Sequence, residues 1–249
     1  MAGVVKVVHS WRCVSDAVVA ALSEPTTDPF VRPILVAPGN AQSRSLLQSL
    51  ARRHGIAAGI DTTTPLGLRE RLEEDLLGVK RENDPWQPGS LALRICRVIE
   101  NNSPGFEVVS AHLEASRRQG VPRATWTTAR QAADAICALA RDSHDVLNAW
   151  ADGAAPTSHQ GDTDLAGDPL DPARAWWAPL WRTLLAKPCH VPDPVSRHQL
   201  LVDAILTQSR SEPPIVWFSS TTTAQHDVSL AEALSASHDV TIVHLDHGI

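Results

Sequence analysis

The stretch Pro33-Ile-Leu-Val-Ala-Pro-Gly-Asn-Ala-Gln-Ser-Arg-Ser45 decides the fold. Its four apolar residues from Ile34 to Ala37 are typical of a strand buried on both faces, and Pro38-Gly39 ends that strand with a turn. The leucines that follow at helical spacing predict a helix running to about His54. In an open α/β sheet, such a strand-to-helix turn is where ligands bind.

The turn has the architecture of a nucleotide-binding loop without its chemistry. A phosphate-binding loop follows the pattern Gly-x-x-x-x-Gly-Lys-Ser/Thr, in which glycines free backbone N–H groups for the phosphates and the lysine supplies positive charge. Counted from Gly39, this chain has Arg44 in place of the second glycine, Ser45 in place of the lysine and Leu46 in place of the magnesium-binding hydroxyl. We therefore expect no cofactor in this chain.

The composition is that of an ordinary globular protein, with 249 residues, 43% apolar and 20% charged. A net charge of −6 excludes an electrostatic nucleic-acid binder as a whole but leaves a local basic patch possible. Such a patch could form from the arginines of the first half of the chain; solvated helix faces are the alternative interpretation.

The cysteines and the hydropathy indicate a cellular compartment. Cys13, Cys96, Cys137 and Cys189 are widely spaced and form no C-x-x-C pair, so the sequence indicates neither a zinc site nor a disulfide framework. No signal peptide or run of membrane-spanning length is evident. We therefore predict a cytoplasmic protein that does not contact a membrane.

Residues 1–64 predict the first part of a parallel sheet. The expected strands are Val4 to Val8, Ile34 to Ala37 and Ile56 to Ile60, separated by the helices Val14 to Leu22 and Asn40 to His54. The sheet returns in residues 211–249, which we interpret as truncated. The expected elements there are the strand Ile215 to Phe218, the helix Val228 to Leu234 and the strand Val240 to His244.

Residues 65–210 predict a long helical insertion, because their apolar residues recur at three- and four-residue spacing. The expected helices are Leu66 to Leu77, Leu91 to Glu100, Phe106 to Arg118, Thr125 to Leu139, Asp145 to Trp150, Ala173 to Leu185 and Arg197 to Leu206. Residues 152–172 predict an exposed loop. Its aspartates Asp162, Asp164, Asp168 and Asp171 could in principle bind calcium, but the glycine is misplaced and no bidentate glutamate follows at the required spacing, which favours a solvated loop.

An apolar and aromatic stripe marks the helix 173–185. It consists of Trp177, Leu180, Trp181, Leu184 and Leu185. Such a stripe could stack on nucleic-acid bases, but its continuity with leucines favours a core or interdomain contact.

Two hypotheses about enzyme activity rest on these residues alone. The helix N-terminus at residues 40–43 could be the anion site of a small α/β nucleotide- or phosphate-binding enzyme with a divergent loop. The cluster His244-x-Asp246-His247 contains the residue types that hold zinc or iron, which makes a metal hydrolase the other hypothesis.

Several motifs occur in an order that is specific in combination. They are Val8-His9-Ser10, Asp28-Pro29-Phe30, the turn from Val36 to Leu46, Gly55-Ile-Ala-Ala-Gly-Ile-Asp61, Ala175-Trp-Trp-Ala-Pro-Leu-Trp181 and the late strand-helix-strand from Ile215. Over most of its length the chain resembles the N-terminal part of the RecC family, the gamma subunits of bacterial exodeoxyribonuclease V, the RecBCD helicase-nuclease.

The resemblance implies a helicase-like, P-loop NTPase-like α/β domain whose ATP site is degenerate and which carries a long helical insertion. Family members split duplex DNA ends, guide the unwound single strand and contribute to recognition of a recombination signal. The implied partners are DNA and the beta and alpha subunits of a hetero-trimer, which use ATP and Mg. The family chains are much longer, so we expect this chain to be a fragment. In the family, motor and nuclease work belong to the beta and alpha chains, so we expect this chain to be non-catalytic.

The resemblance also implies a set of DNA-binding residues. Pro38, Asn40, Arg44 and Thr64 occupy positions that would face the single strand. Arg44 would contact a phosphate or a base edge, whereas Asn40 and Thr64 would hydrogen-bond a splayed base. Where many family members carry Gly-Met and Trp-Leu, this chain has Ala41-Gln42 and Ser45-Leu46.

Overall fold

The computed structural model describes residues 3–24, 28, 30–101, 105–153, 176–208, 211–220 and 224–246. The chain divides into two compact units. The sheet unit consists of Met1–Lys80 and Gln199–Ile249, and the helical unit consists of Arg81–His198. The predicted domain boundaries at 64/65 and 210/211 stay a prediction.

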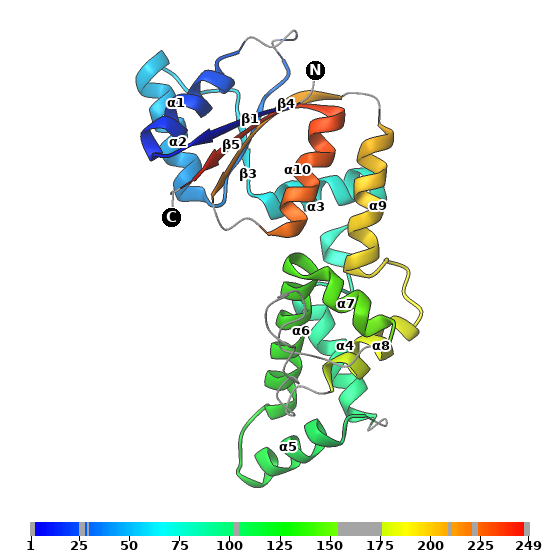
Figure 1. The fold of residues 1–249 in the computed structure, drawn as a ribbon. Helices are drawn as coiled ribbons and strands as arrows, with labels where there is room; N and C mark the ends of the chain where they lie inside the picture. The colour runs from blue at the N-terminus through cyan, green and yellow to red at the C-terminus, as the bar shows by residue number, and fades with distance from the viewer. Residues whose placement is uncertain are drawn as a thin grey trace. The chain divides into compact units, whose positions relative to one another are not determined.

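A parallel sheet of five strands, in the order β1-β5-β4-β2-β3, forms the centre of the sheet unit (Figure 1). The strands are β1 (Val4–Val8), β2 (Ile34–Val36), β3 (Asp61–Thr63), β4 (Ser211–Ser220) and β5 (His238–Leu245). The two late strands lie between β1 and β2, so the first and last parts of the chain share one sheet. The prediction of an α/β fold with a parallel sheet is confirmed.

Helices cover both faces of this sheet. One face packs against α1 (Trp11–Leu22) and α2 (Asn40–His54), and the other against α3 (Pro65–Leu77), α10 (Gln225–Ser237) and the later residues of α9 (Pro194–Thr207). Successive residues of a strand point to opposite faces. Leu35 therefore lies in the first core and Ile34 and Val36 lie in the second, which explains the uninterrupted apolar run of β2.

The described part of the helical unit contains a short 3₁₀ helix (Arg81–Asn83) and five α-helices before α9. These are α4 (Pro88–Glu100), α5 (Glu107–Arg118), α6 (Ala124–Asp142), α7 (His144–Ala151) and α8 (Trp177–Ala186). Leu180, Trp181 and Leu184 of the predicted stripe are buried, and the ring of Trp181 lies 5.6 Å from that of Trp86. For these three residues the prediction of a core contact is confirmed.

A buried ion pair joins the beginning and the end of the helical unit. Arg197 Nη1 donates to Asp84 Oδ2 at 2.9 Å, and the two side chains are 9% and 2% exposed. The other oxygen, Asp84 Oδ1, accepts the backbone N–H of Trp86 at 2.9 Å. A charge this deeply buried is stable only when it is paired and hydrogen-bonded.

The prediction of a strand from Ile56 to Ile60 is wrong. Gly55 and Gly59 have φ angles of 80° and 72°, which interrupt extended pairing, and the residues that pair with β2 are Asp61–Thr63. Ala57 and Ile60 instead pack against the core beneath α1 and α2. Their apolar character therefore reflects packing of a loop.

Of the predicted 152–172 loop, Asp152 is the C-cap of α7, whereas Asp162, Asp164, Asp168 and Asp171 lie outside the described residues. Where the structure is described, none of the helices combines the length and the apolar character needed to cross a membrane.

Candidate functional site

The connections after β2 and β4 run in opposite directions. The chain leaves β2 for α2 on one face of the sheet and leaves β4 for α10 on the other. Val36 is paired with Trp217, so Gly39 and Ser220, each three residues further on, lie at the same level of the sheet. Neighbouring parallel strands whose connections diverge form the switch point at which open α/β sheets bind ligands.

The turn after β2 presents free backbone donors at this switch point. Gly39 is the N-cap of α2, with an extended φ of −165°, and its carbonyl accepts from the N–H of Ser43 at 3.1 Å. Within the helix, the N–H groups of Asn40, Ala41 and Gln42 have no carbonyl to bond, as at every helix start. Together with the helix dipole, they make this end of α2 attractive to an anion.

Asn40 and Arg44 lie on one exposed face at the start of α2. They are four residues apart, which places them on the same side of the helix. Both are exposed, whereas Ser43 and Leu46 between and beyond them are buried against the sheet. Arg44 takes part in none of the ion pairs among the described residues, so its guanidinium is free to meet an anion near the three N–H groups.

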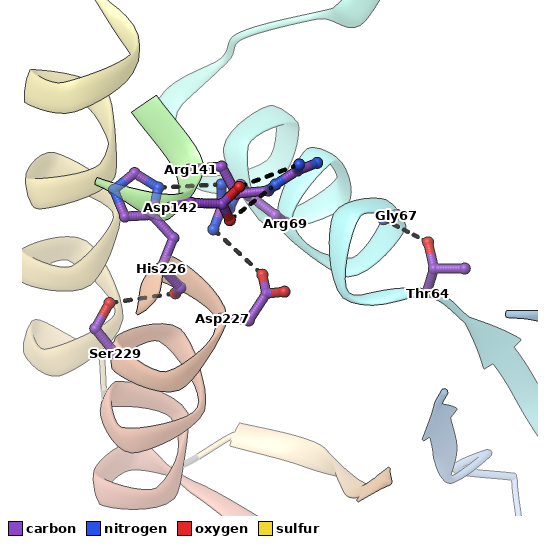
Figure 2. Close-up of polar contacts among 8 residues, drawn as sticks. All are labelled: Thr64, Gly67, Arg69, Arg141, Asp142, His226, Asp227 and Ser229. Carbon is purple, nitrogen blue, oxygen red and sulfur yellow. Dashed lines mark hydrogen bonds and ion pairs between the residues drawn. The ribbon is translucent and has the colours of Figure 1, made fainter. Parts of the chain in front are cut away.

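Pro38 and Thr64 follow neighbouring strands. Pro38 is exposed, while the preceding Ala37 is buried and donates its N–H to the carbonyl of Thr63 at 3.0 Å. Thr64 is the N-cap of α3, and its Oγ1 accepts from the N–H of Gly67 at 3.1 Å (Figure 2). The hydroxyl of Thr64 therefore keeps its own proton for a further hydrogen bond.

The four predicted positions thus lie on two adjacent turns at one edge of the sheet. We call Pro38, Asn40, Arg44, Thr64 and the free N–H groups of residues 40–42 the switch site. It offers hydrogen-bond donors and one positive charge. It contains neither a lysine nor a hydroxyl placed as in a phosphate-binding loop.

A polar cluster that the sequence did not reveal joins α3 to α10. Arg69 donates from Nη1 to His226 Nδ1 at 3.3 Å and from Nη2 to Asp227 Oδ1 at 3.4 Å (Figure 2). Arg69 and Asp227 are only 11% and 16% exposed. Because Thr64 caps α3 just before Arg69, this cluster holds one side of the switch site in place.

The C-terminal His/Asp cluster has a different environment from that of a metal site. His244 Nδ1 lies 2.9 Å from Ser219 Oγ, and the backbone N–H of Asp246 donates to the carbonyl of Val8 at 2.8 Å. His247 lies outside the described residues. Among those that the structure does describe, no three His, Cys, Asp or Glu side chains are grouped so that they could hold a metal ion.

Comparison with known proteins identifies the family. The family described as "RecC, N-terminal domain" matches residues 8–246. The "RecBCD enzyme subunit RecC" of Mycobacterium tuberculosis (strain ATCC 25618 / H37Rv) is 30% identical over 250 residues, which cover 91% of this chain and 20% of the relative. The protein of the same name from Mycolicibacterium smegmatis (strain ATCC 700084 / mc(2)155) is 26% identical over 237 residues, covering 91% and 19%. The chain thus spans about one fifth of the length of these relatives, and it belongs to the RecC N-terminal domain family.

Proposed function

We propose that this chain is the N-terminal, DNA-binding and non-motor part of a RecC-type subunit. In this proposal the subunit belongs to an ATP-dependent helicase-nuclease that processes double-strand DNA ends for homologous recombination. The observation that carries the proposal is the free, exposed start of α2 beside Arg44, at the switch point of a sheet whose sequence belongs to the RecC family.

The switch site suits a single DNA strand. The N–H groups of residues 40–42 and the guanidinium of Arg44 are donors for phosphate oxygens. The amide of Asn40 carries both a donor and an acceptor, so it can pair with the edge of an unstacked base. The hydroxyl of Thr64 accepts one hydrogen bond from Gly67, so its proton and its second lone pair can both serve a base edge. The site would thereby guide the unwound strand and contribute to recognition of a recombination signal.

The same proposal assigns the motor and nuclease work to partner chains. We interpret the sheet unit as a helicase-like domain of the P-loop type in which the ATP site has been lost, because Ser45 stands where the phosphate-binding lysine belongs. ATP and Mg are used by the beta and alpha subunits of the hetero-trimer, and this chain has no cofactor of its own. The proposal includes a cytoplasmic location, which the widely spaced free cysteines support.

Two measurements on the purified protein test the proposal. Fluorescence anisotropy with a labelled oligonucleotide should report binding of single-stranded DNA that weakens as salt is raised. A coupled ATPase assay should report no turnover. Turnover that disappears when Arg44 is replaced, or a complete lack of DNA binding at low salt by a folded protein, would contradict the proposal.

The second candidate function is a small nucleotide- or phosphate-binding enzyme. The free N–H groups of residues 40–42 favour it, because a helix N-terminus binds phosphate without a lysine. A thermal-shift screen separates the two candidates. Stabilisation by millimolar ATP beyond that given by inorganic phosphate supports the enzyme, because the proposed DNA site would also bind phosphate; an unchanged melting temperature with both removes the enzyme.

A further inference from the structure

The edge strand β1 has the sequence of an interior strand. It reads Val-Val-Lys-Val-Val, and Val4, Val5 and Val7 are 50%, 62% and 55% exposed. The opposite edge strand, β3, is Asp-Thr-Thr, which is short and polar. Proteins keep exposed sheet edges short or charged, whereas uninterrupted apolar runs belong to parallel strands covered on both sides. β1 carries one such charge, Lys6, but three of its four valines are exposed, so it is the less protected of the two edges.

The exposed valines of β1 continue the two cores of the sheet unit. Val5 is paired with Ile242 and Val7 with His244, on the face that α10 covers over β5. Val8, on the opposite face, packs against the core beneath α1 and α2. Within the described residues β1 pairs with β5 alone. The cores therefore run to the open edge of β1, where nothing described covers them.

We propose that β1 pairs along its open edge with a further strand of the same polypeptide, supplied from outside residues 1–249. This inference does not depend on the DNA-binding proposal. The matched relatives have about four fifths of their length outside the region aligned with this chain, so a polypeptide of that kind has ample material for the strand and for a helix to cover the valines.

A second copy of the chain fits the open edge poorly. A symmetric pairing of two β1 strands would be antiparallel, and the register that pairs all five residues is centred on Lys6. That pairing places Lys6 directly opposite Lys6 of the other copy, and like charges in direct opposition destabilise a sheet. A strand from elsewhere in the polypeptide can instead place a polar or acidic residue opposite Lys6 and apolar residues opposite the valines.

The test is site-specific photo-crosslinking in the full-length product of the gene, purified with its partner chains. Benzoylphenylalanine replaces Val5 in one variant and Val7 in another, and the crosslinked peptides are identified by mass spectrometry. Thr62, exposed on the polar edge strand β3, is the matched control. We expect Val5 and Val7 to crosslink to one stretch of the same polypeptide outside residues 1–249, and Thr62 to crosslink to no such stretch.

Hydrogen exchange on the unmodified full-length protein gives a second readout that needs no substitution. In a parallel strand, alternate N–H groups point to opposite sides, so a strand paired on both sides protects every amide. We expect every amide of Val4–Val8 to exchange at least about tenfold more slowly than the amide of Thr62, whose N–H faces the open side of β3. Free exchange at every second residue, crosslinks to a second copy or to a partner chain, or a reading frame that stops after codon 249 would overturn the proposal.

Discussion

Replacing Asp84 by alanine tests the account of the helical unit. The variant removes the carboxylate that pairs with Arg197 at 2.9 Å and also accepts the N–H of Trp86. Because both side chains of the ion pair are almost fully buried, Arg197 would retain a charge without this carboxylate and without water. Breaking a buried pair from one side costs about 3–5 kcal/mol.

This loss of unfolding free energy lowers the melting temperature by a measurable amount. A protein of this size loses about 2–4 °C in melting temperature per kcal/mol, so we expect Asp84→Ala to melt about 6–20 °C lower, with the loss confined to the transition of the helical unit. Differential scanning calorimetry measures the shift. Six of the eight tryptophans, Trp181 among them, lie in the helical unit, so tryptophan fluorescence reports mainly on the transition of that unit.

A matched control separates burial from charge. Asp134 pairs with Arg130 at 3.0 Å on the surface of α6, with both side chains about half exposed. An exposed pair four residues apart contributes only about 0.3–0.5 kcal/mol, so Asp134→Ala should lower the melting temperature by about 2 °C or less. Equal, small shifts for the two variants would refute the reasoning, because the pair at Asp84 would then not be isolated from water.

The remaining predictions concern single side chains. Thr64→Ala should lose about 1 kcal/mol in urea unfolding because α3 loses its cap, whereas Thr64→Ser should keep most of it; equal losses would contradict the capping role. Burial lowers the pKa of His238, so the unfolded chain binds more protons below the usual histidine pKa, and stability should fall as the pH drops from about 7.5 to 5.5. His238→Gln should make that fall shallower, and an unchanged pH dependence would contradict the assignment. Burial raises the pKa of Cys137 to about 11, so iodoacetamide at pH 8 should label the exposed Cys13 and Cys189 first and Cys137 only on unfolding, as peptide mass spectrometry would show.

Local patterns predicted most elements of the fold. The apolar run of β2, the leucine spacing of α2 and the three- and four-residue spacing of apolar residues in the later helices each show which side of one element is buried, so they can be read from the sequence. The error at Ile56–Ile60 arose because a loop packed on the core has the same composition as a strand. The two left-handed glycines, which exclude a strand, are visible only as φ angles.

The site was predictable only in part. Pro38, Asn40 and Arg44 follow a strand directly, and the sequence alone places such a turn at the edge of a parallel sheet. The contacts of Arg69 with His226 and Asp227 span 157 and 158 residues of the chain, and a local sequence pattern cannot predict a contact over that separation. Thr64 is a helix cap because β3 ends at Thr63 and α3 begins at Pro65. The sequence analysis placed the third strand at Ile56 to Ile60 and therefore did not predict this role.

The most direct test of the DNA-binding claim compares two arginines of α2. Arg44→Ala removes the charge beside the free N–H groups, and Arg52→Ala removes the same charge eight residues, or about 12 Å, further along the helix, where the side chain is also exposed. Fluorescence anisotropy with a single-stranded oligonucleotide is measured over a series of salt concentrations. We predict that Arg44→Ala weakens binding several-fold and lowers the slope of log K against log salt by about 0.7, the value for one phosphate contact, while Arg52→Ala changes neither. Equal effects of the two variants, or no effect of either, would contradict the claim that the switch site binds the strand.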